Sequence, residues 1–99
     1  MLFAIFCEDN PDSLEGRRQA RPAHLERLHA LKKEGRLVLA GPHPAIESHD
    51  PGEAGFTGSL IVAEFASLAE AQHWAATDPY HAFNIYQSVI IKPFRQALP

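Results

Sequence analysis

One histidine of this chain lies among leucines on a predicted helix. With about 100° of rotation per residue and His24 at zero, Leu28 falls near 40° and Leu31 near −20°. The imidazole therefore faces the apolar side of the helix, where an unpaired polar group costs about 1–3 kcal/mol. A backbone carbonyl can satisfy such a histidine. The more informative alternative is a carboxylate partner.

Asp78 is the best candidate for that partner. It lies in the turn Asp78-Pro79-Tyr80, where the second predicted helix ends. A carboxylate bound to an imidazole orients the ring and raises its basicity, which predicts a general base working near neutral pH. Aspartate before proline is also a common helix cap, so Asp78 has a purely structural alternative. The two roles are compatible, because a carboxylate has two oxygens.

Four residues are candidates for contacts with a substrate. Arg17 and Arg21 precede His24 in an arginine-rich segment, and paired guanidinium donors suit a carboxylate or a phenolate. Arg21 falls near 60° on the same rotation, on the His24 side. Ser59 offers a hydroxyl beside a glycine, and Tyr80 lies two residues from Asp78. The alternatives are a solvated helix face for the arginines and a turn role for the serine.

The other histidines do not form a metal-binding pattern. His43, His49 and Asp50 share a loop, but no His-x-x-x-His pair and no zinc-site spacing occurs. A Gly-x-Ser-x-Gly elbow, typical of serine hydrolases, is also missing. We therefore predict neither a metal nor a cofactor.

Length and composition predict one small globular domain covering residues 1–99. The chain is 45% hydrophobic and 21% charged. Nine basic against 12 acidic residues give a net charge of −3, which does not favour nucleic-acid binding. No apolar run approaches the roughly 20 residues of a membrane span, and the N-terminus lacks signal-peptide features. The single cysteine, Cys7, excludes an internal disulfide and fits a reducing, cytoplasmic setting.

The hydrophobic pattern predicts the element order β-α-β-β-α-β. A short helix is expected from residue 12, which Pro22 kinks or restarts, and a long loop is expected over 42–58. The main strands are predicted over 2–7, 36–40, 59–65 and 85–91, and the main helices over 22–34 and 67–77.

This order is typical of a ferredoxin-like α+β fold, a four-stranded antiparallel sheet with two helices on one face. The first strand is apolar at both parities, so both of its faces should be buried. We expect a second copy of the chain to cover the bare face of the sheet, giving a homodimer.

Several sequence blocks, in this order along nearly the whole chain, resemble the YciI-like family. They are Met1-Leu2-Phe3, Arg21-Pro22-Ala23-His24-Leu25, Glu34-Gly35-Arg36-Leu37, Ala40-Gly41-Pro42, Gly55-Phe56-Thr57-Gly58-Ser59, Asp78-Pro79-Tyr80 and Lys92-Pro93-Phe94. The resemblance implies a dimeric ferredoxin-like fold related to the dimeric α/β-barrel proteins. It also implies a His–Asp pair in a cleft, carried here by His24 and Asp78.

The resemblance does not imply one reaction, because most members of the family are uncharacterised. One relative is a dehydrochlorinase of chlorinated aromatics, and muconolactone isomerases belong to the same wider group. Two functions are therefore predicted. The first is a cofactor-independent lyase or isomerase that acts on a small cyclic or unsaturated acid. The alternative is a non-catalytic dimeric module that binds a small acidic metabolite.

Overall fold

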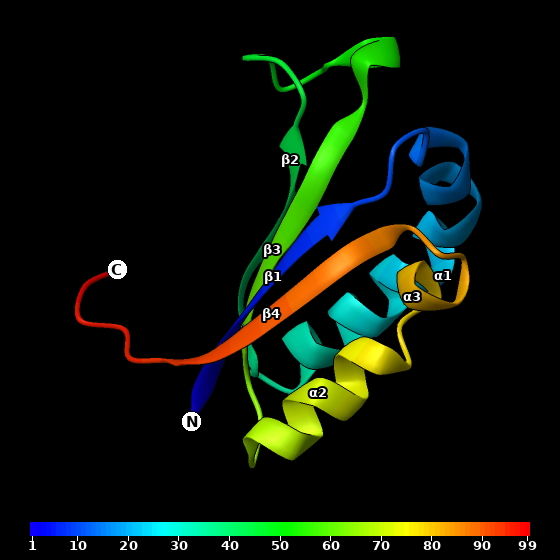
Figure 1. Cartoon of the computed structure of the whole chain (residues 1–99). Coiled ribbons are helices and arrows are strands. Elements are labelled where there is room, and N and C mark those ends of the chain that lie inside the picture. Colours follow the sequence, from blue (N-terminus) through cyan, green and yellow to red (C-terminus); the bar gives the residue numbers. More distant parts are fainter.

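A computed structural model describes all residues, 1–99, and shows a four-stranded sheet with three helices on one side (Figure 1). The strand order is β2-β3-β1-β4, and all neighbouring strands are antiparallel. This arrangement confirms the predicted ferredoxin-like α+β fold. No helix is both long and apolar enough to cross a membrane. The elements are β1 (Leu2–Asp9), α1 (Leu14–Lys33), β2 (Leu37–Pro44), a 3₁₀ turn (Gly52–Ala54), β3 (Phe56–Glu64), α2 (Leu68–Ala76), α3 (Pro79–Ala82) and β4 (Tyr86–Phe94).

The core lies between the sheet and the helices. Side chains alternate between the two faces of a strand, and Phe3, Ile5 and Cys7 of β1 all point toward the helices and are buried. Leu28 and Leu31 of α1 pack against them in the same cluster. The predicted apolar stripe of α1 therefore holds the helix on the sheet, with His24 on the same side.

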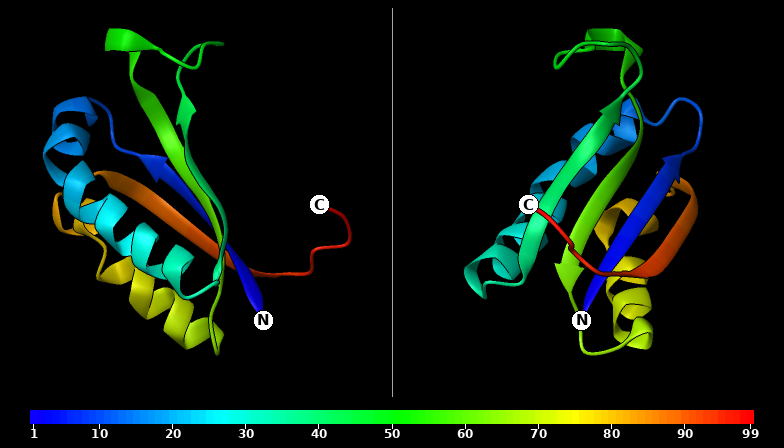
Figure 2. Two further views of the ribbon diagram at one scale, coloured as in Figure 1. Left: turned by 180° about the vertical axis from the view of Figure 1, so that it is seen from behind. Right: turned by 90° about the vertical axis from the view of Figure 1, so that its left-hand side faces the viewer.

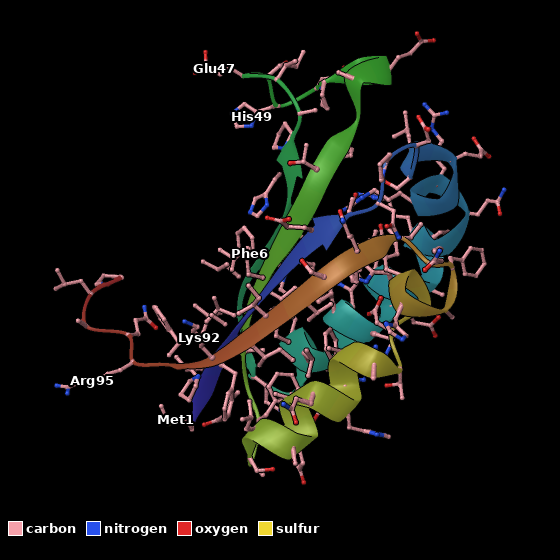
Figure 3. The ribbon with its side chains drawn as sticks, in the orientation of Figure 1. Met1, Phe6, Glu47, His49, Lys92 and Arg95 are labelled. Atoms are coloured by element: carbon pink, nitrogen blue, oxygen red, sulfur yellow. The ribbon has the colours of Figure 1, made fainter.

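The opposite face of the sheet carries no helix (Figures 1 and 2). Phe6 and Lys92 project from this side in Figure 3. The register places Phe6 beside Leu60 and Ile90 on it, across three neighbouring strands. Four of its large apolar side chains are 38–52% exposed. We call this surface the open face; its exposed apolar residues are Phe6, Leu39, Ile90 and Phe94.

The N-terminal helix differs from its prediction. A kink or restart at Pro22 was expected. The helix does not restart there, because α1 is one helix of 20 residues that contains Pro22. A proline removes one backbone hydrogen bond and crowds the preceding turn. Here Pro22 lies on the exposed side of the helix, and buried residues before and after it, Ala20 and His24, hold both halves on the sheet.

Two strands also extend beyond their predicted ends at residues 40 and 91, and both extensions contain prolines. β2 continues through Pro42 to Pro44, and β4 continues through Pro93 to Phe94. Both are edge strands, where one side of the backbone has no ladder partner and proline is tolerated. The connection between β2 and β3 is consequently shorter than predicted. It projects beyond the rest of the sheet (Figure 2) and is closed by a hydrogen bond from Ala45 N–H to Gly55 O of 2.9 Å.

Candidate functional site

A cavity of about 390 Å³ lies between the N-terminal half of α1 and strands β2 and β3. We call it the α1 cavity. One side is formed by Arg17, Arg21 and His24 of α1, and Ser59 of β3 and Tyr80 of α3 reach it from the body of the protein. Its volume lies within the range of about 300–1,000 Å³ that is usual for small-molecule sites.

His24 and Asp78 meet at this cavity. His24 Nδ1 and Asp78 Oδ1 are 2.8 Å apart, and the two residues are 6% and 2% exposed. The same carboxylate accepts a hydrogen bond from Tyr80 N–H at 2.9 Å, so Asp78 also caps α3. The structural role and the pairing role therefore coexist in one side chain.

The contacts of Asp78 fix the tautomer of His24. A carboxylate that accepts its other hydrogen bonds from an N–H and a guanidinium offers only lone pairs to the ring. The proton between them therefore belongs to Nδ1, and in the neutral ring the lone pair is on Nε2. Nε2 makes no hydrogen bond within the protein and is not sealed from solvent, and His24 lines the α1 cavity.

The Tyr80 ring stacks on the face of the His24 imidazole. The two rings are stacked, with centroids 3.9 Å apart and planes inclined by 8°. Burial raises the pKa of the Tyr80 hydroxyl, and the charges of Arg17 and Arg21 offset only part of this effect. The phenol is consequently neutral near pH 7 and keeps a proton that it can donate.

Arg17 was predicted to contact the substrate. It is only 5% exposed, and most of its donors are engaged within the protein. Its Nε and Nη2 donate to Asp9 at 2.6 and 3.0 Å, and Nη2 also donates to Ser59 Oγ at 2.8 Å. Burial alone would lower the pKa of Arg17, but the hydrogen bonds and charge of Asp9 outweigh it and raise that pKa. Nη1 has no partner within the protein and is not sealed from solvent.

The remaining predicted contacts differ in exposure. Ser59 is 3% exposed, and its hydroxyl accepts the bond from Arg17 beside the cavity. Arg21 is exposed, lines the cavity and has no ion-pair partner. Five of the six predicted site residues thus line one cavity, and Asp78 is joined to it through its contact with His24. Arg17 and Ser59 are already bound to each other.

Two charged residues of the site were missed by the sequence analysis. Arg27 donates to Asp78 Oδ2 at 3.0 Å, and Asp9 is the partner of Arg17. Arg27 carries a detectable signal, because it follows His24 by three positions and so shares its helix face. Asp9 carries none, because its role depends on how the end of β1 meets α1. No three His, Cys, Asp or Glu residues lie together as a metal site would require.

Fold and site together define a small ferredoxin-like α+β protein with a buried His–Asp pair at the edge of a cavity. Residues 1–95 match the YCII-related domain, and the chain belongs to that family. It is 56% identical to the protein YciI of Escherichia coli over 97% of this chain and 98% of that protein. It is 49% identical to an uncharacterised protein of Haemophilus influenzae, with the same coverage.

A solved structure of similar shape comes from Burkholderia phenoliruptrix AC1100. It is 5-chloro-2-hydroxyhydroquinone dehydrochlorinase (TftG) in complex with 2,5-dihydroxybenzoquinone. The TM-score is 0.86 at 27% identity, over 98% of this chain and 96% of the other. These findings confirm the family resemblance drawn from the sequence blocks.

Proposed function

We propose that this protein is a small cofactor-independent enzyme, of lyase or isomerase type, in which His24 acts as a general base oriented by Asp78. The supporting observation is that His24 Nδ1 is bound to the buried carboxylate, so that in the neutral ring the lone pair is on Nε2, and His24 lines the α1 cavity. The similar structure of a named dehydrochlorinase supports the same class of reaction. The substrate is a small cyclic or unsaturated acid.

In the elimination form of the reaction, Nε2 takes a proton from the substrate. The electron pair of the broken bond forms a new double bond, and chloride leaves with the electron pair of the carbon–chlorine bond. In the isomerisation form no group leaves, and His24 returns the proton to a different carbon. Both forms develop negative charge on a substrate oxygen, and preorganised donors stabilise such charge.

Donors for that oxygen line the same cavity as His24. Arg17 Nη1 is unpartnered, and the Tyr80 hydroxyl is neutral and close to the same guanidinium. Arg21 supplies a further positive charge at the cavity wall. Ser59 holds Arg17 and lines the cavity itself. This set favours an anionic, oxygen-rich ligand over an apolar one.

The proposal is tested with H24A and D78N. Chlorinated hydroxyhydroquinones and small lactone acids are screened for chloride or proton release, and 2,5-dihydroxybenzoquinone binding is followed by difference absorbance. Loss of a general base typically lowers the rate by about 10²–10⁴-fold. H29A is the matched control, because His29 is an exposed histidine of the same helix. Unchanged turnover in H24A and D78N would defeat the assignment.

The same experiment separates the alternative function, a non-catalytic module that binds a small acidic metabolite. Such a module turns over none of the screened compounds and retains its affinity for the benzoquinone in H24A. An enzyme shows turnover in the wild type and loses it in that variant.

We also propose that the protein is a homodimer whose subunits meet through their open faces, in a reducing compartment such as the cytoplasm. The four exposed apolar side chains of that face are 38–52% exposed in a single chain, which supports the interface. The only thiol, on Cys7, is free and buried, which supports the reducing compartment. F6E should shift the sedimentation coefficient from dimer to monomer. I46E is the control, because Ile46 is 54% exposed but lies in the β2–β3 connection. A dimeric F6E would refute the proposed interface.

A further inference from the structure

Arg27 of α1 contacts the His–Asp pair directly, through the carboxylate of Asp78. It lies three residues after His24, so both side chains leave the helix on the same face. Its Nη1 donates to Asp78 Oδ2 at 3.0 Å, while His24 holds Oδ1. The two oxygens of one carboxylate are thus divided between the base and a cation.

The rest of the arginine is fixed by the end of α2. Nη1 also donates to Trp74 O, Nη2 donates to Thr77 Oγ1, both at 3.0 Å, and the guanidinium carbon lies 4.4 Å from the centre of the Trp74 ring. The side chain of Arg27 is 25% exposed and that of Asp78 is 2% exposed. Arg27 therefore holds its charge at the border between solvent and a nearly sealed carboxylate.

The charge balance of the site depends on this contact. Asp78 carries one negative charge in the protein interior, which is costly unless a positive charge accompanies it. Besides the imidazole, the group in direct contact with this carboxylate is the guanidinium of Arg27, which always carries a positive charge. The other ionisable groups around the pair are Arg17 and Arg21 of α1, Tyr80 of α3, Cys7 of β1 and Tyr86 of β4.

None of those groups supplies the positive charge that Arg27 places beside Asp78. The charge of Arg17 is matched by Asp9, and Arg21 is exposed to solvent. Burial raises the pKa values of Cys7, Tyr80 and Tyr86, so all three are neutral near pH 7. With Arg27 in place, carboxylate and guanidinium balance each other, and the imidazole can stay neutral.

We infer that Arg27 is a positioning residue that keeps His24 Nε2 unprotonated by supplying the counter-charge of Asp78. Without this cation the His–Asp pair carries an uncompensated negative charge and takes up a proton. That proton either makes an imidazolium or moves to the carboxyl group, which then donates to Nδ1. Both outcomes place a proton on Nε2 and remove the lone pair that faces the α1 cavity.

The test is ¹⁵N NMR of the imidazole nitrogens at pH 7 in R27Q, R27K and R36Q. The ¹⁵N shift separates a protonated ring nitrogen from one with a lone pair. R27Q should show His24 Nε2 protonated in most molecules, and R27K, which keeps the charge, should restore the wild-type pattern. R36Q is the matched control, because Arg36 also binds a backbone oxygen and a carboxylate and lies 5.3 Å from an aromatic ring centre. An R27Q spectrum with Nε2 unprotonated overturns the inference.

A stability measurement covers the case in which R27Q does not fold well enough for NMR. If R27Q is unstable because the Asp78 carboxylate has lost its counter-charge, R27Q/D78N unfolds at a higher urea concentration than R27Q. An equal or lower midpoint shows that Arg27 acts only through packing and refutes the inference. The inference rests on the proposed role of His24, but neither measurement uses a substrate. A protonated Nε2 in R27Q together with an enzyme-inactive wild type would therefore reject the proposed function alone.

Discussion

The ion pair between Asp9 and Arg17 gives the sharpest test of how the site is held together. Both side chains are nearly sealed from solvent, at 2% and 7% exposure, and the carboxylate accepts from Arg17 at 2.6 and 3.0 Å. Asp9→Asn keeps the size of the side chain and removes its charge. Arg17 then remains buried beside β3 with no negative partner, while Ser59 Oγ and Gly58 O still accept its other hydrogen bonds.

The expected loss of stability is large. Removing one member of a buried ion pair costs about 3–5 kcal/mol, because the other charge stays buried without compensation. At about 4–8 °C per kcal/mol for a domain of this size, the melting temperature should fall by about 12–40 °C. Replacing both members should be milder, so D9N/R17M is expected to recover part of the loss.

Thermal unfolding at pH 7 and one fixed protein concentration measures the effect. E15Q is the matched control, because the Glu15–Arg18 pair spans 3.6 Å with 70% and 63% exposed side chains. Such a surface pair is worth less than about 1 kcal/mol. A D9N protein that melts within a few degrees of E15Q would show that the buried pair does not hold Arg17 in place.

Three further predictions concern the interior beside the α1 cavity. The Tyr86 hydroxyl is sealed and has no hydrogen-bond partner, so Y86F should raise the free energy of unfolding by about 1 kcal/mol in urea denaturation, and a loss would contradict this. Burial raises the pKa of the Cys7 thiol from 9.0 to about 12. The buried neutral thiol therefore stabilises the fold fully below pH 9, and this stabilisation is lost between pH 9 and 12. At pH 8 a thiol reagent should modify the unfolded protein much faster than the folded one. A Cβ on Gly58 would lie 2.0 Å from Cys7 O, whereas one on Gly41 would meet no atom within 4 Å, so G58A should lower the melting temperature far more than G41A.

The sequence was sufficient for those parts of the fold that depend on local pattern. Leu28 and Leu31 mark the buried side of α1, and Ser67 caps α2 by accepting a hydrogen bond from Glu70 N–H. The same helical rotation places His24 toward the core. These features follow from the spacing of neighbours along the chain, which needs no knowledge of the sheet.

The errors concern residues whose effect depends on their surroundings. Pro22 interrupts a helix only where packing does not hold both sides, and Pro93 ends a strand only where the next backbone needs its N–H. β4 is an edge strand because of the strand order, and the residues of a single strand do not determine that order. The ion pair of Arg17 was not foreseen for the same reason, because Asp9 accompanies Arg17 only once β1 and α1 are packed together.

The 54 positions that separate His24 from Asp78 have a consequence for motion. The first residue belongs to the N-terminal β-α-β half and the second to the C-terminal half, and α3, which Asp78 begins, is a single turn of four residues. If α3 lifts away from α1, the imidazole loses its acceptor and its stacked tyrosine together, while the strand ladders involve other residues and stay formed. Ligand affinity at the cavity would then decline well before circular dichroism registered any loss of secondary structure.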